Sequence, residues 1–167
     1  MATTEKIKRP LIAHFLDTAK APDYATGTTW KRIGLNVTDM SIDYGAQTET
    51  EQDIVSNSAT TDVTGYQPTS AVSQQCTKGD EIFTFITELR RNRAILGDCQ
   101  TWLLNVDLWD VTTDKYQAEV QRVSIQVDTY GGAGGETPVQ EFTINFVGDP
   151  IKGTVALTDG TPTFTKT

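Results

Sequence analysis

The sequence has little of the chemistry on which enzymes and metalloproteins depend. Its 167 residues include one histidine and two cysteines. His14 has no second imidazole to act with, which excludes most zinc sites and most histidine-based catalytic triads. Cys76 and Cys99 stand in no metal-binding or redox spacing. The glycine-rich run GGAGGE (131–136) lacks the last glycine of a dinucleotide-binding motif. We therefore expect no catalytic activity and no cofactor.

Cationic residues and long apolar runs are also scarce. There are 14 Lys and Arg against 22 Asp and Glu, which gives a formal net charge of −8. Stable nucleic-acid binding requires cations that neutralise phosphates, so this balance argues against it but allows the transient passage of double-stranded DNA. No run of about 18 apolar residues is present, and residues 1–10 lack the apolar segment of a signal peptide. We expect a protein made in a cytoplasm, with no membrane partner.

The sequence is rich in the pattern of bent β-strands. Thr, Val, Ile and aromatic residues are frequent, and apolar residues alternate with polar ones. In WKRIGLNVTDMSIDY (30–44), the apolar residues change from odd to even positions near Thr38–Asp39. A similar change separates residues 116–120 from residues 123–127. Such a change predicts a bulge, and bent antiparallel strands suit a mainly β fold with a sandwich or barrel-like core.

One helix is predicted beside this sheet, over residues 80–96. Asp80 is a suitable N-cap and Gly97 a suitable stop signal. The apolar stripe expected to cover the sheet contains Ile82, Phe85, Ile86, Leu89 and Leu96. The first part, EIFTFIT, also has strand propensity. Further along, a tight turn at Thr113–Asp114 predicts a hairpin between residues 100–112 and 115–129.

The chain length fits a single domain. We expect this domain to span residues 30–157, with a long polar loop or hairpin over residues 45–76. An N-terminal arm (1–29) and a C-terminal tail (158–167) are expected to be flexible.

The polar segment 45–62, GAQTETEQDIVSNSATTD, is unusual for a small domain. Its adjacent aliphatic residues are Ile54 and Val55, and loops longer than about 12–15 residues are uncommon. We interpret it as a surface for other copies of the same protein. In a strand, Glu49, Glu51 and Asp53 share one face. This acidic row is either a charged edge that prevents mispairing or the wall of a channel that repels phosphate.

A basic cluster, Arg90, Arg91 and Arg93, lies near the end of the predicted helix. These cations either suit the helix dipole or pair with an acidic neighbouring subunit. The candidate contacts between subunits are therefore Ile54, Val55, Tyr66, Arg90, Arg91 and Arg93.

Residues 114–155, DKYQAEVQRVSIQVDTYGGAGGETPVQEFTINFVGDPIKGTV, resemble the second half of the tail tube proteins (major tail proteins) of long-tailed, non-contractile bacteriophages. The shared order is a hairpin turn, a bent strand, a glycine-rich loop, a strand of the EFTINF type and then Gly-Asp-Pro. Upstream, TFITELRRNRAILGDCQTWLLNVD (84–107) is similar to the helix and strand of that family. The resemblance covers residues 30–165.

The resemblance implies a structural virion protein that forms hexameric rings. These rings stack into a tube that surrounds a tape measure protein during assembly and later conducts the genome. Tail terminator and distal tail proteins are the implied partners at its ends, and assembly in the host cytoplasm is implied. The segment 45–76 and both termini are the implied contacts between subunits and rings.

Two other classes remain open from the sequence. One is a monomeric β-sandwich binding or adhesion module, which would use exposed aromatic residues such as Trp30, Trp102 or Trp109. The other is a small enzyme on a β-scaffold. Particle size separates the first of these from a tube subunit.

Overall fold

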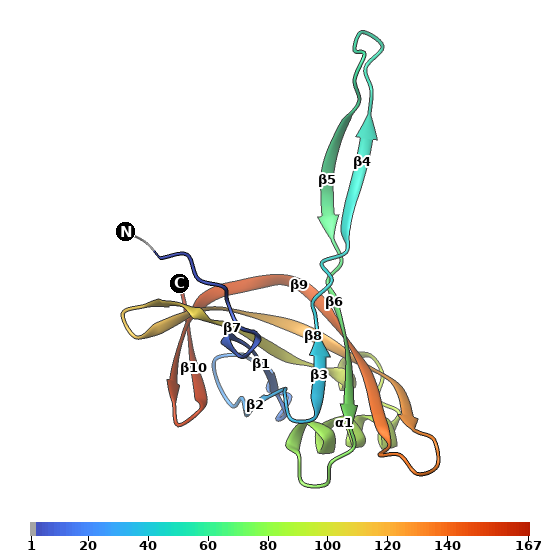
Figure 1. Ribbon diagram of the computed structural model, residues 1–167, viewed down its shortest axis with the longest axis vertical. Coiled ribbons are helices and arrows are strands. Elements are labelled where there is room, and N and C mark those ends of the chain that lie inside the picture. Colours follow the sequence, from blue (N-terminus) through green and yellow to red (C-terminus); the bar gives the residue numbers. More distant parts are fainter. Residues whose placement is uncertain (1–2) are drawn as a thin grey trace.

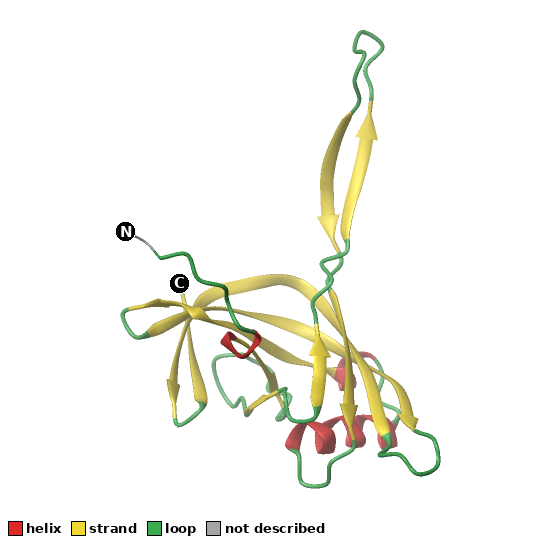
Figure 2. Cartoon of the chain, viewed as in Figure 1, coloured by secondary structure: helices red, strands yellow, loops and turns green. Residues whose placement is uncertain are grey.

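The computed structural model describes residues 3–167 and consists mainly of one curled antiparallel sheet (Figures 1 and 2). The order of the strands across it is β2-β1-β7-β8-β9-β6-β3, and β10 pairs with β9. The elements are η1 (Arg9–Leu11), β1 (Ile12–Asp17), β2 (Trp30–Arg32), β3 (Val37–Met40), β4 (Ala46–Glu51), β5 (Thr60–Tyr66), β6 (Thr69–Gln75), α1 (Glu81–Asn92), η2 (Leu96–Cys99), β7 (Gln100–Thr112), β8 (Lys115–Gly131), β9 (Val139–Thr158) and β10 (Thr161–Lys166). The predicted mainly β, barrel-like class is confirmed.

The predicted bends coincide with shifts in strand register. The pairing of β3 with β6 shifts between Val37 and Met40, as the change of phase near Thr38–Asp39 predicts. The pairing of β8 with β9 shifts between Val120 and Arg122. The turn between β7 and β8 contains Thr113 and Asp114, with φ values of 52° and 60°. Two successive positive φ values match the right-handed twist of a hairpin, so the predicted tight turn is confirmed.

The curled sheet carries a hydrophobic core on each of its two faces. The first core lies under α1 and is centred on Ile86, Leu103 and Phe142. The second core contains Phe15 and Leu104, which are the neighbours of Leu16 and Leu103 along their strands. Because successive strand residues point to opposite faces, one run of apolar residues supplies both cores. Along the long strand β8 the cores separate, because Val123 and Ile125 belong to the first core and Val120 belongs to the second.

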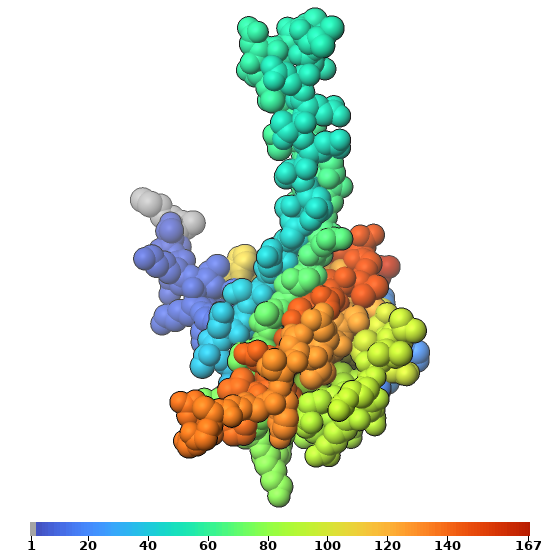
Figure 3. Space-filling model, turned by 90° about the vertical axis from the view of Figure 1, so that its right-hand side faces the viewer, coloured from blue at the N-terminus to red at the C-terminus, as the bar shows by residue number. Residues whose placement is uncertain are grey.

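The hairpin of β4 and β5 stands apart from this body (Figure 3). Every residue of β4 is exposed, and in β5 only Gly65 is partly covered. The protruding part is shorter than the predicted segment 45–76, because Thr69–Gln75 form β6 in the main sheet with Val72 and Gln74 buried. Burial alternates along β6. The strand was not recognised in the sequence because most residues of this segment are polar.

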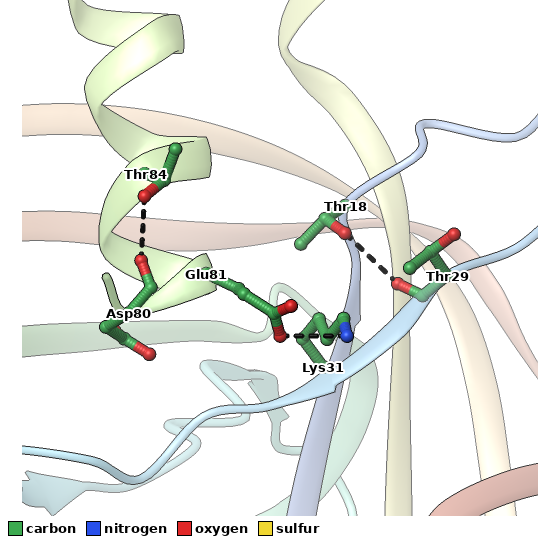
Figure 4. Close-up of polar contacts among 6 residues, drawn as sticks. All are labelled: Thr18, Thr29, Lys31, Asp80, Glu81 and Thr84. Atoms are coloured by element: carbon green, nitrogen blue, oxygen red, sulfur yellow. Dashed lines mark hydrogen bonds and ion pairs between the residues drawn. The ribbon is translucent and has the colours of Figure 1, made fainter.

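Helix α1 begins as predicted but ends early. The Asp80 carboxylate accepts the N–H of Phe83, and the Thr84 hydroxyl donates to the Asp80 carbonyl (Figure 4). An ion pair of 2.9 Å between Glu81 and Lys31 fixes the helix to β2. Beside it, the Thr18 hydroxyl donates to the Thr29 carbonyl.

The predicted end of the helix at residue 96 is wrong. Arg93 adopts a left-handed conformation with φ of 49°, and the Ala94 N–H donates to the Leu89 carbonyl. This C-cap closes the helix four residues before Gly97. Leu96 is consequently exposed and does not belong to the apolar stripe.

Both ends of the chain contribute strands, which the sequence did not predict. Within the segment 1–29 that was expected to be an arm, Ile12–Asp17 form β1 between β2 and β7, and five of its six residues are buried. Within the expected tail 158–167, Thr161–Lys166 pair with β9 as β10. The folded domain therefore extends well beyond residues 30–157 on both sides.

Candidate assembly surfaces

The hairpin tip presents an apolar pair in an acidic setting. Ile54 and Val55 are about as exposed as in an extended chain, at 104% and 90%. Residues 45–67 contain four acidic residues and no Lys or Arg. Glu49 lies directly opposite Asp62, a like-charge pairing that destabilises a strand pair. The hairpin is thus poorly suited to stand alone, whereas a cationic and apolar surface on another molecule would stabilise it.

The structure places the acidic row on this hairpin. Glu49 and Glu51 share one face of β4. Asp53 lies beyond the end of β4, in the tip turn where its carbonyl accepts the Ser56 N–H at 3.0 Å. The alternation argument therefore does not extend to Asp53. Asp62 of β5 joins the row instead, and it was missed because the pairing register of β5 cannot be derived from the sequence.

The candidate contact residues at the base of the hairpin and near the end of α1 differ in whether their side chains are free to contact another copy. Tyr66, at the base of the hairpin, is 62% exposed. The Arg90 guanidinium lies 3.9 Å from the centre of the Tyr130 ring, and the Arg93 guanidinium donates to the Arg90 carbonyl. Both are engaged within the chain. Arg91 is exposed on the surface of α1.

A polar face, made of side chains that hydrogen-bond to one another, lies on the side of the sheet that faces away from α1. It is formed where β8, β9 and β6 pair. The Asp128 carboxylate accepts from Thr143 at 2.7 Å and from Gln126 at 2.6 Å. The Thr129 hydroxyl donates to Glu141 at 3.0 Å. This polar face, which sequence reasoning missed, comprises Ser124, Gln126, Asp128, Thr129, Glu141, Thr143 and Asn145. It carries two acidic residues and no cation.

One long strand has an open edge beside this polar face. Strand β7 pairs with β8 only as far as Ser124, while β8 continues to Gly131 along β9. In the described part of the chain, residues 125–131 thus have a strand partner on one side only. Such an edge can accept a strand from another molecule.

His14 links the start of the chain to the sheet. Its Nδ1 lies 2.7 Å from Oδ1 of Asn105, and its Nε2 lies 3.2 Å from the Arg9 guanidinium. Because the guanidinium can only donate, Nε2 is the acceptor and Nδ1–H donates to Asn105. Burial lowers the pKa of His14, and the charges of Arg9 and Arg32 lower it further against the opposing effects of Asn105 and Asp107.

We expect His14 to make the protein less stable in mild acid. Below about pH 6.5 the unfolded chain takes up a proton on His14 that the folded chain resists, so the free energy of unfolding falls as the pH falls. Urea unfolding between pH 8 and pH 5 is the measurement, with His14→Gln as the control. The wild type should lose more stability over this range than the variant. Identical pH profiles would contradict the argument.

Metal-binding clusters and membrane-spanning helices are both absent from the residues that the structure describes. Between residues 3 and 167, His, Cys, Asp and Glu form no group of three that could hold a metal ion. The described helices are also too short and polar to span a bilayer.

Comparisons with known proteins identify the fold. No family model matches the sequence, and no curated protein matches it. Among solved structures, the SPP1 tail tube, determined by solid-state NMR and cryo-EM, is similar with a TM-score of 0.66 at 14% identity. The similarity covers 93% of this chain and 82% of that chain.

Two further assemblies share the architecture. The tail of an empty GTA particle, refined with C6 symmetry, has a TM-score of 0.56 at 11% identity, over 87% of this chain and 97% of that chain. A chain of the sheath/tube terminator structure of an extracellular contractile injection system (PVC) has a TM-score of 0.54 at 12% identity, over 90% and 99%. The chain has the fold of tail tube proteins, which confirms at the level of fold the resemblance in the sequence.

Proposed function

We propose that this chain is a structural subunit of a phage tail tube, which forms six-fold rings that stack into a conduit for genome ejection. The observation that carries the proposal is a tail-tube fold with an exposed acidic hairpin that pairs only with itself. Within this chain β4 and β5 pair with no other strand, whereas a polymer can use the hairpin between rings. The six-fold symmetry is suggested by the C6 tail of the GTA particle.

The alternative, a monomeric binding module, finds less support in the aromatic residues. Trp30 and Trp102 pack against the second core, and the Trp102 indole donates to the Ala21 carbonyl at 3.0 Å. Among the three tryptophans, Trp109 is the only one that is exposed, at 46%. A single exposed indole provides little of the aromatic platform such a module uses.

We assign different roles to the two acidic surfaces. The polar face is the better candidate for a channel wall, because it belongs to the main sheet and its side chains hydrogen-bond to one another. A wall of anionic and neutral groups would let DNA pass without holding it. Glu49, Glu51 and Asp53 are on the protruding hairpin, so we propose that they contact other copies. The tape measure, tail terminator and distal tail proteins remain the proposed partners, and the virion the proposed location.

The proposal predicts the size of the particles. Concentrated wild-type protein should show rings or tubes by negative-stain electron microscopy and sediment far faster than an 18.3 kDa monomer. Class averages of end views should be six-fold. A monomer at every concentration, in the presence and absence of a tail terminator, would contradict a tube-forming role.

A further inference from the structure

We propose that the hairpin tip of one copy docks in a groove of a second copy, formed by residues 9–12 and 32–40. The inference rests on the proposed tube function and adds the receiving surface. The groove has a volume of about 550 Å³ and lies between η1 and the β2–β3 segment. Its apolar lining residues include Pro10, Ile12, Leu35 and Val37.

The groove is cationic as well as apolar. Arg9 and Arg32 line it, together with a single acidic residue, Asp39. The Arg32 guanidinium donates to the Pro10 carbonyl at 3.0 Å. The Arg9 guanidinium donates to the carbonyls of Ile12 and Met40 at 2.8 and 2.9 Å. Both cations are therefore held in place before any partner arrives, which lowers the entropic cost of binding.

The hairpin tip has the complementary chemistry. Its apolar pair, Ile54 and Val55, follows Asp53 and Glu51 in the sequence. The apolar side chains match the exposed Leu35 and its neighbours, and the carboxylates match the two arginines. Opposite charges on the rim of an apolar contact give it orientation and speed its formation.

The occupant must come from another copy. The hairpin extends away from its own body (Figures 1 and 3), and the six residues of β4 alone span roughly 20 Å. Strand β3 leads toward the hairpin, and the β2–β3 loop with Leu35 lies at the far end of that strand (Figure 1). The tip therefore lies far from the groove of its own chain. A contact between two different surfaces repeats from copy to copy, as stacking requires.

A cysteine pair tests the contact directly. Leu35→Cys and Ile54→Cys are combined in a chain whose half-buried Cys76 is replaced by Ser, and assembled protein is oxidised mildly. We expect a ladder of covalent multimers on a non-reducing gel, and no ladder from either single variant. A covalent dimer from Ile54→Cys alone would show that two tips meet each other and would overturn the proposal.

A charge exchange tests the same contact without oxidation. Arg32→Glu should raise the concentration needed for assembly about tenfold or more, and adding Asp53→Arg should restore most of the loss. Lys78→Glu, in the exposed turn that precedes α1, is the matched control and should assemble normally. Circular dichroism of each variant verifies folding.

The outcomes separate this inference from the tube function. If the wild type never forms rings or tubes, the proposed function fails. If the wild type forms tubes while Arg32→Glu assembles normally and the cysteine pair gives no ladder, the groove is not the receiving surface and the function stands.

Discussion

Replacing residues 47–65 with an Asn-Gly turn is expected to abolish assembly and to leave a folded monomer. The excised residues are almost all exposed, and β4 and β5 pair with each other but not with the main sheet. Substitutions at exposed positions change the free energy of unfolding by about 0.5 kcal/mol or less, and we expect the loss of this exposed hairpin to have a similarly small effect. An Asn-Gly pair favours the tight turn that must rejoin Ala46 to Tyr66, which face each other at the base.

Two measurements on the shortened chain test whether it is folded and whether it is a monomer. Sedimentation at high concentration should find the shortened chain at the mass of a monomer under conditions in which the wild type polymerises. Urea unfolding should give both chains nearly the same midpoint. A second chain with the full hairpin but Ile54→Ser and Val55→Ser separates the tip from the stem, and should assemble only at higher concentration. Tubes from the shortened chain would exclude the hairpin as the contact between rings, and loss of its fold would show that the hairpin supports the body.

Local features of the sequence predicted local features of the fold. The phase change near Thr38–Asp39, the turn at Thr113–Asp114 and the cap at Asp80 each depend on a few neighbouring residues. The position of β1 depends on something else. Ile12–Asp17 become a strand because β7, about 90 residues later, pairs with them, and the local sequence beside Pro10 resembles an arm.

The hairpin tip and the groove, which form the proposed contact, differ in the same way: the first is a local feature of the sequence and the second depends on long-range pairing. The hairpin is continuous in sequence, so its polarity and its adjacent aliphatic pair indicate an interaction surface from the sequence alone. The groove brings together Arg9 and Arg32 through the pairing of β1 with β2 and the bonds of Arg9 to Met40. The positions of these two residues in the sequence do not indicate that they lie close together. The polar face likewise needs the register of β8 against β9.

Asp17→Ala is expected to destabilise the monomer by about 4 kcal/mol, because it leaves buried backbone donors without acceptors. Asp17 is fully buried at the end of β1. Its carboxylate accepts the N–H groups of Ala19, Ala21 and Thr29 at 3.0, 2.8 and 2.8 Å. These bonds fold residues 18–29 over the second core.

The segment held in this way supplies part of that core. Tyr24 packs edge-on against Trp102, with ring centres 5.6 Å apart, and against Phe164 at 5.7 Å. Releasing residues 18–29 would therefore expose aromatic surface in addition to the unsatisfied donors. The Trp102 indole, which bonds to the Ala21 carbonyl, provides a fluorescence signal for the change.

Urea unfolding of dilute protein, followed by tryptophan fluorescence, measures the loss. Asp23→Ala is the matched control, because Asp23 is exposed and accepts only the nearby Ala25 N–H at 3.0 Å. It should change the free energy of unfolding by about 0.5 kcal/mol or less. If the two variants prove equally stable, the carboxylate of Asp17 does not hold the segment. If Asp17→Ala alone is destabilised and its fluorescence already differs in the absence of urea, one buried side chain fixes both the strand end and the loop that covers the second core.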